Sequence, residues 1–132
     1  MNAVLADSGP LYALVDVTDN QHHRALDDLQ TLYSMGTTIA APTVILMETY
    51  SLILYRLGTN AASRWLSQLE GGMGLIEPRR EDFQAASNRI RRYPDQSITL
   101  FDAVLAELSG KLAVPVWTFD HHFDVMQVQV WR

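Results

Sequence analysis

Two kinds of apolar segment alternate along the chain: short continuous runs, and longer segments in which apolar residues recur at helical spacing. This order predicts strands that are each followed by helices. Short, almost continuous apolar runs are typical of strands buried on both faces of a parallel sheet. Runs with apolar residues three and four positions apart predict helices. The predicted strands are Ala3–Ala6, Thr37–Ala41, Met73–Ile76, Val114–Phe119 and an edge strand at Val128–Trp131. The predicted helices are Leu11–Val15, His22–Tyr33, Thr43–Leu57, Asn60–Leu69, Glu81–Tyr93 and Thr99–Leu112.

This order of elements predicts the fold class. Strands that alternate with helices indicate an α/β protein, here a three-layer α/β/α sandwich around a mainly parallel central sheet. A chain of 132 residues is long enough to bury about two-thirds of its unfolded surface in one core. We therefore expect a single domain that spans residues 1–132.

Composition narrows the class of protein. The chain is 48% hydrophobic and 19% charged, which is typical of a soluble globular domain. It has no cysteine, which excludes disulfides, thiolate metal sites and a cysteine nucleophile, and fits a cytoplasmic protein. Neither a membrane-spanning run nor the basic lead of a signal peptide is expected from the sequence. The net charge of −5 argues against a protein that coats nucleic acid.

Three acidic residues stand where strands end or helices begin. Asp7 closes the first predicted strand, Asp102 lies in the first turn of a late helix, and Asp120 follows the last buried strand. Each one also has a purely structural explanation as a helix cap. Because strand C-termini and helix N-termini meet at one edge of an α/β sheet, we expect the three carboxylates to lie together.

Glu48 has no such structural explanation. Most of its neighbours at helical spacing are apolar, and no basic residue lies within one turn. A buried carboxylate without a partner is expensive or becomes protonated. Its partner is therefore either a distant arginine or a metal ion. Four converging carboxylates would repel one another, and an all-oxygen ligand set favours Mg²⁺ or Mn²⁺ over zinc.

These residues resemble the PIN-domain family. The matching positions, in order along the chain, are Asp7-Ser8, Glu48, Asp102-Ala103, Thr118-Phe119-Asp120 and Phe123. Within that family the chain is most similar to the VapC-type toxins of toxin–antitoxin pairs. The resemblance implies an endoribonuclease dependent on Mg²⁺ or Mn²⁺, an antitoxin that inserts into the active-site groove, and a homodimer. His121-His122 departs from the family pattern.

The resulting hypothesis is metal-assisted hydrolysis of RNA. Asp7, Glu48, Asp102 and Asp120 would hold one or two ions, which activate the attacking water and offset charge on the leaving oxygen. Ser8, Thr118 and Asp124 would support these ligands. We expect His121 and His122 to contact metal or phosphate less readily than the acids do. His22 and His23 are expected on the solvated surface, and Tyr50 and Tyr55 in the core.

An arginine-rich stretch is either a solvated face or a surface that holds RNA phosphates. It consists of Arg79, Arg80, Arg89, Arg91 and Arg92.

Two other functions remain open from the sequence. One is a PIN-like module that binds RNA or protein without cutting. The other is an aspartate phosphotransfer domain with Asp7 as acceptor. A phosphohydrolase of that type carries a second Asp two residues later, where this chain has Gly9, and a receiver needs a late-strand lysine. The single lysine, Lys111, lies in a predicted helix.

Overall fold

The computed structural model describes residues 2–132 and contains a four-stranded sheet whose strand pairings are all parallel. The strands are arranged in the order β3-β2-β1-β4. In chain order they are β1 (Ala3–Ala6), β2 (Thr38–Pro42), β3 (Gly74–Ile76) and β4 (Val116–Trp117). Because all strands point the same way, their C-terminal ends lie along one edge of the sheet.

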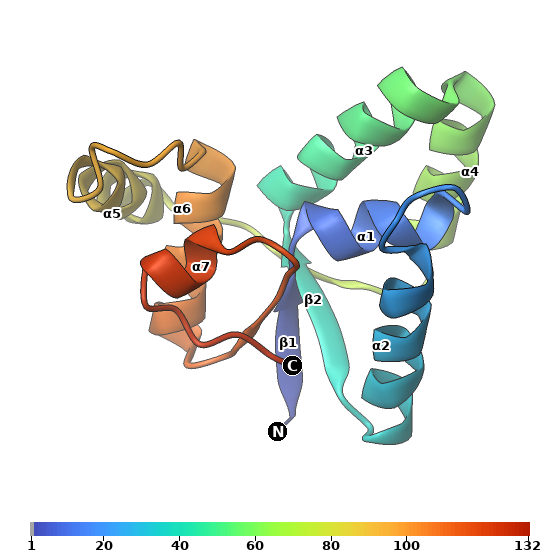
Figure 1. The fold of residues 1–132 in the computed structure, drawn as a ribbon, viewed down its shortest axis with the longest axis horizontal. Coiled ribbons are helices and arrows are strands. Elements are labelled where there is room, and N and C mark those ends of the chain that lie inside the picture. The colour runs from blue at the N-terminus through green and yellow to red at the C-terminus, as the bar shows by residue number, and fades with distance from the viewer. Residues whose placement is uncertain (1) are drawn as a thin grey trace.

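Seven helices surround this sheet in the described chain: α1 (Ser8–Val15), α2 (His22–Ser34), α3 (Thr43–Leu57), α4 (Thr59–Leu69), α5 (Arg80–Arg91), α6 (Leu100–Leu112) and α7 (His122–Val125). In Figure 1, α5, α6 and α7 lie on one side of β1 and β2, and α1 and α2 lie on the other. The helices α3 and α4 extend beyond the C-terminal ends of the strands. This arrangement confirms the predicted three-layer α/β/α fold.

The core forms around β1, β4 and α6. Val4, Leu5 and Ala6 of β1 and both residues of β4 are buried, as expected for strands covered on both faces. On β4, the Trp117 indole donates a hydrogen bond to Asp28 of α2, with a nitrogen–oxygen distance of 3.0 Å. β4 is thereby tied to a helix far away in sequence.

The helices α3 and α6 both end at the residue that the sequence predicts. α3 occupies the predicted range and ends at Gly58, whose φ of 93° is accessible to glycine and strained for other residues. α6 also ends at the predicted Leu112, but it runs through Gly110 and is terminated by Ala113 with φ 55°.

The last part of the sheet differs from the prediction. β4 covers Val116–Trp117 only, because Pro115 has no N–H group and the Thr118 side chain bonds to Asp7 and Asp120 as the chain turns away. The predicted edge strand Val128–Trp131 is wrong. This segment forms an isolated bridge between Val130 and Val116.

Two side chains of α3 that we expected in the core differ in their burial. Tyr50 is half-buried against the core, whereas Tyr55 is 87% exposed, so its predicted core position is wrong. Across the described residues, the helices are too short or too polar to cross a bilayer.

Candidate metal-binding active site

Asp7 and Thr118 meet where β1 and β4 end side by side. The Asp7 backbone N–H donates to the Trp117 carbonyl at 2.9 Å. The Asp7 carboxylate accepts a hydrogen bond from the Thr118 hydroxyl at 2.7 Å and another from the Ser8 N–H at 2.8 Å. Asp7 is therefore the N-cap of α1 and at the same time a buried carboxylate at the sheet edge.

Asp102 reaches the same region from the first turn of α6. The Thr99 hydroxyl caps this helix by accepting a hydrogen bond from the Asp102 N–H at 3.1 Å, which leaves the buried Asp102 side chain at the helix start. Burial and the charge of Asp120 raise the pKa of Asp102. Hydrogen bonds from Thr99 and the charge of His122 lower the pKa, but the net direction is upward.

Glu48 approaches from α3 and is half-buried. Its Oε1 atom is fully buried and has no hydrogen-bond partner among the described residues. Burial raises the pKa of Glu48, the nearby Ser8 side chain lowers it, and the charges of Asp102 and Asp120 raise it further. Glu48 is thus a carboxylate with one unused oxygen beside two other acids.

The pKa of Asp7 shows how strongly these groups affect one another. Burial first, and the charge of Asp102 second, raise this pKa from 3.8 to about 7, against the hydrogen bonds from Thr118 and Ser8. Within residues 2–132, Asp7, Glu48 and Asp102 have no ion pair with lysine or arginine. The structure therefore brings Asp7, Glu48 and Asp102 into one electrostatic unit that has no lysine or arginine counter-charge among the described residues.

This donor set fits a hard divalent cation. All its ligands would be carboxylate oxygens, which suit Mg²⁺ and Mn²⁺. The unpartnered Oε1 of Glu48 is the kind of buried polar atom that needs such a ligand. Burial is the main cause of the raised pKa values of Asp7, Glu48 and Asp102, and the neighbouring carboxylates add to it. A bound cation would offset both effects, because it stabilises the charged form of each carboxylate.

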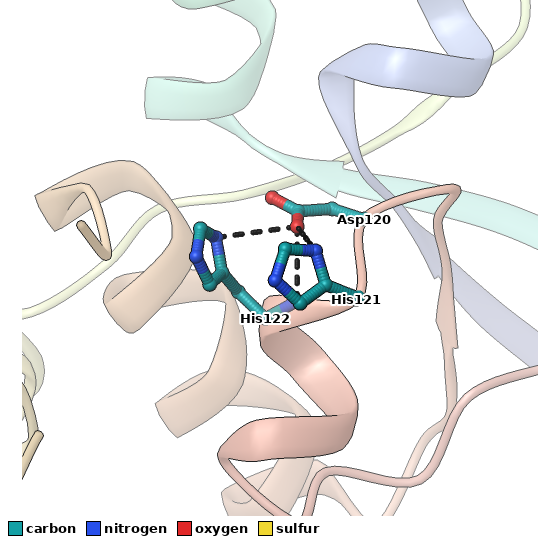
Figure 2. A group of neighbouring side chains, drawn as sticks. All are labelled: Asp120, His121 and His122. Carbon is teal, nitrogen blue, oxygen red and sulfur yellow. Dashed lines mark hydrogen bonds and ion pairs between the residues drawn. The ribbon is translucent and has the colours of Figure 1, made fainter. Parts of the chain in front are cut away.

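Asp120 is held in place next to Asp7 and is surrounded by histidines. Its backbone N–H donates to the Thr118 hydroxyl at 3.0 Å, and its Oδ1 accepts from the His122 N–H at 2.9 Å. The Nδ1 atoms of His122 and His121 lie 3.2 Å and 3.6 Å from the same Oδ1 (Figure 2). Among the described residues, this trio is the group of three potential metal ligands whose atoms all lie within 4.8 Å of one another.

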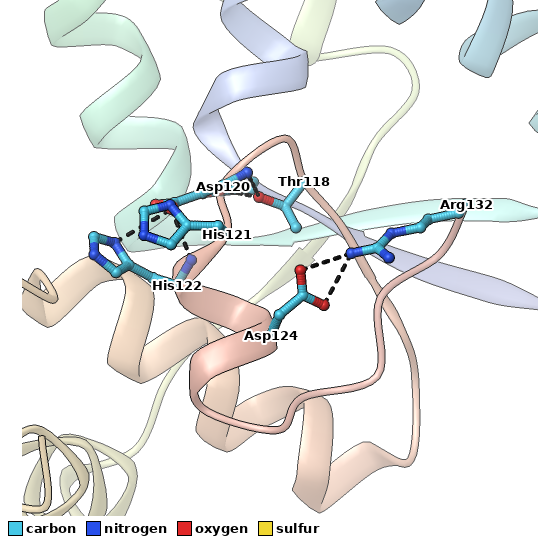
Figure 3. Close-up of polar contacts among 7 residues, drawn as sticks. Thr118, Asp120, His121, His122, Asp124 and Arg132 are labelled. Carbon is cyan, nitrogen blue, oxygen red and sulfur yellow. Dashed lines mark hydrogen bonds and ion pairs between the residues drawn. The ribbon is translucent and has the colours of Figure 1, made fainter. Parts of the chain in front are cut away.

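Two arginines that sequence reasoning missed lie beside Asp120. Arg24 of α2 and Arg132 at the C-terminus line a pocket of about 220 Å³ together with Asp120 and His121. Arg132 donates to both oxygens of Asp124 at 2.9 Å and 2.7 Å (Figure 3), so Asp124 lies in an exposed ion pair. Arg24 lies on α2 and Arg132 follows α7, and the folded chain brings both to this pocket.

Solved structures with a similar fold are known, whereas sequence comparisons find no match. No protein-family model and no curated protein sequence matches the chain. The structure is similar to that of Mycobacterium tuberculosis VapC20, a toxin that cleaves the sarcin–ricin loop. The TM-score is 0.84 and the identity 19%, over 98% of both chains. The chain has the PIN-domain fold.

Two further solved structures have a similar fold. One is VapBC2 from Rickettsia felis, bound to a DNA fragment from its promoter, with a TM-score of 0.75 and 11% identity over 98% of this chain and 97% of the other. The other is FitAcB from Neisseria gonorrhoeae, with a TM-score of 0.69 and 16% identity over 98% and 96%. All three comparisons span nearly the whole length of the PIN fold described here.

The arginine-rich stretch lies mainly along α5 and is not one surface. Arg89 is half-buried in an ion pair with Glu107 of α6, with a nitrogen–oxygen distance of 2.8 Å. Near the start of α5, Asp82 pairs with Lys111 at the end of α6, so the two helices are antiparallel. Arg79 and Arg80 are therefore exposed at the end of α6 opposite Asp102.

The two histidines at the start of α2 differ in their burial. His22 is buried, and its Nδ1 lies 2.6 Å from the Ala13 carbonyl oxygen, so its predicted place on the solvated surface is wrong. His23 is exposed as expected. The contact to Ala13 joins α2 to α1, which sequence periodicity does not reveal because it links two separate helices.

Proposed function

We propose that this PIN domain is a divalent-metal-dependent endoribonuclease and the toxin of a toxin–antitoxin pair. Because a fold alone does not determine an activity, the proposal depends on the site. Its main support is the buried Oε1 of Glu48, which has no hydrogen-bond partner among the described residues and lies near the carboxylates of Asp102 and Asp120. The similarity in fold to VapC20, a toxin that cleaves an RNA loop, supports RNA as the substrate class.

The residues of the chain have distinct tasks in this proposal. Asp7, Glu48, Asp102 and Asp120 hold one or two Mg²⁺ or Mn²⁺ ions. When bound, such ions supply activation of the attacking water and stabilisation of the leaving oxygen. Thr118 orients Asp7 through its hydroxyl and also fixes the backbone of Asp120.

Proton release accompanies metal binding in this proposal. Since the pKa of Asp7 is about 7 without metal, a fraction of the molecules carries a proton there near neutral pH. A ligand carboxylate must lose its proton before it can bind a cation. We therefore expect metal affinity to increase as pH rises through neutrality.

The pocket beside Asp120 is the proposed entry for RNA phosphates. Arg24 and Arg132 lie there with Asp120 and His121, and arginine matches the geometry of phosphate oxygens. Arg24 also lies 4.3 Å from the centre of the Phe119 ring, which orients its side chain. The exposed Arg79 and Arg80 at the start of α5, and the exposed Arg91 and Arg92 at its end, are further candidate contacts for RNA.

Apolar grooves on α3 fit the proposed protein partners. A groove of about 450 Å³ contains Glu48 together with Met47, Tyr55 and Phe101, which are all exposed. An antitoxin segment that fills it would cover Glu48, which explains inhibition by simple obstruction. A neighbouring groove of about 460 Å³ shares Met47 and Ser51 with the first and is lined by residues of α3 and α4, and we propose it as the homodimer contact.

Cleavage of RNA by the purified chain tests the enzymatic proposal. Substrates would be total RNA and an RNA that carries the sarcin–ricin loop, each with EDTA, Mg²⁺ or Mn²⁺. The variants are Asp7→Asn and Glu48→Gln, with Asp27→Asn as the matched control because Asp27 is an exposed carboxylate of α2. We expect discrete fragments from wild type and from the control, with metal only, and none from the two site variants.

Three other outcomes would contradict the proposal or favour one of the alternative functions. Cleavage by Asp7→Asn at the wild-type rate would refute the assigned site. Metal and RNA binding by the wild type without any cleavage would favour the non-catalytic binding module. A stable adduct with beryllofluoride at Asp7 would instead favour phosphotransfer.

A further inference from the structure

Asp120, His121 and His122 bring one carboxylate oxygen and two imidazole nitrogens to a single point. We propose that these three residues form a second metal site, which binds a divalent ion that prefers nitrogen ligands, with Zn²⁺ as the representative. The proposal goes beyond the nuclease, whose Mg²⁺ or Mn²⁺ would be held by oxygen atoms. Imidazole is a ligand that suits zinc and later transition metals, whereas Mg²⁺ prefers oxygen.

The three potential ligand atoms already lie as near to one another as a metal site requires. Both Nδ1 atoms lie near Oδ1 of Asp120, and all three ligand atoms are within 4.8 Å of one another. Both imidazole rings turn toward this carboxylate (Figure 2). Small rotations of the side chains would place the three atoms around one ion without any change in the backbone.

Both rings approach the same Asp120 oxygen, and the ring centres are 4.4 Å apart. A bound cation accounts for this convergence, because each neutral imidazole can direct a nitrogen lone pair to a shared metal.

Backbone hydrogen bonds hold the segment that carries the ligands, and one of its two histidine side chains is exposed to solvent. The Thr118 hydroxyl holds the Asp120 backbone, and Asp120 in turn holds the His122 backbone. The His122 side chain is half-buried, while that of His121 is 76% exposed. The arrangement thus combines two positioned ligands with a third that can close over an ion arriving from solvent, and it leaves a coordination position for water.

The site lies at the margin of the carboxylate cluster and shares Asp120 with it. The charge of His122 already reaches Asp102. Among the residues that the structure describes, Asp7 is connected to this trio through the Thr118 hydroxyl. Zinc binding should therefore need the two histidines and should persist when Asp7 is neutralised, which separates this site from the proposed magnesium site.

Calorimetric titration of the full chain with Zn²⁺, in excess Mg²⁺, tests the proposal. The variants are His121→Ala, the double variant His121→Ala/His122→Ala, and Asp7→Asn. His23→Ala is the matched control, since His23 is an exposed histidine that also follows another histidine. We expect the double variant to bind Zn²⁺ at least about tenfold more weakly than wild type, since even loss of an outer partner has that effect. Asp7→Asn and His23→Ala should keep wild-type affinity.

A second measurement identifies the ligands directly. In long-range proton–nitrogen NMR spectra, stoichiometric Zn²⁺ should shift the ring nitrogens of His121 and His122 and leave those of His23 unchanged. His121→Ala serves if the double variant is unstable, since His121 is exposed. Absence of Zn²⁺ binding by wild type, equal binding by the double variant, or weaker binding by Asp7→Asn or His23→Ala would each overturn the proposal.

Discussion

Neutralising Asp7 should stabilise the metal-free protein, and the effect should depend on pH. In the folded chain the pKa of Asp7 is about 7, compared with its ordinary value of 3.8. Between these values the folded state keeps a proton that the unfolded state has lost. The free energy of unfolding therefore falls as pH rises through this window, and the full loss is reached above about pH 7.

The magnitude follows from the size of the shift. At 1.36 kcal/mol per pKa unit, the shift from 3.8 to about 7 corresponds to about 4 kcal/mol of lost stability at alkaline pH. Asn has one acceptor oxygen in place of two, so one of the hydrogen bonds from Ser8 and Thr118 is lost at about 1 kcal/mol. Asp7→Asn should therefore be more stable than wild type by about 3 kcal/mol at about pH 8.

Urea unfolding in EDTA, followed by circular dichroism at about pH 5 and about pH 8, measures this difference. Most of the advantage of Asp7→Asn should disappear at the lower pH. Asp27→Asn, which removes an exposed carboxylate, should show little change at either pH. A variant that is less stable than wild type at about pH 8, or an advantage that does not vary with pH, would refute the account of Asp7 as a buried, repelled carboxyl.

Two further substitutions test the fold that positions the site. Gly58→Ala should lower the free energy of unfolding by about 1–2 kcal/mol because Gly58 has a φ of 93°, whereas Gly71→Ala, with open space around it and an ordinary φ, should have little effect in the same urea titration. Trp117→Phe should cost about 1–3 kcal/mol, since it removes the hydrogen bond to Asp28 and leaves buried space. An unchanged urea midpoint in Trp117→Phe would contradict this role.

The fold was predictable from sequence where local signals agree with tertiary packing. The range of α3 was predicted correctly, because an apolar stripe begins after Pro42 and ends at Gly58. The edge strand at Val128–Trp131 was predicted wrongly, because an apolar run does not reveal whether a neighbouring strand is long enough to pair with it. β4 is only two residues long, so Val130 has a single bridge partner.

The candidate site was predictable only in part, because it also depends on contacts between segments that are distant in sequence. Sequence position indicates that an acid ends a strand, but not which side chains from distant segments surround it. The buried contact of His22 with Ala13 and the placement of Arg24 and Arg132 beside Asp120 are properties of packed helices and of the chain terminus. The convergence of His121 and His122 on Asp120 arises from the turn after β4, and histidines in sequence alone do not specify it.

The structural and functional explanations of these acids turn out to be complementary. Asp7 does cap α1, and Asp102 does stand in the first turn of α6. A helix N-terminus stabilises a nearby anion by typically 0.3–1 kcal/mol. That is much less than the energy implied by a pKa raised to about 7 for Asp7. Capping therefore explains why an acid is tolerated at Asp7 and Asp102, whereas the remaining destabilisation of the Asp7, Glu48 and Asp102 carboxylates is what a bound cation would remove.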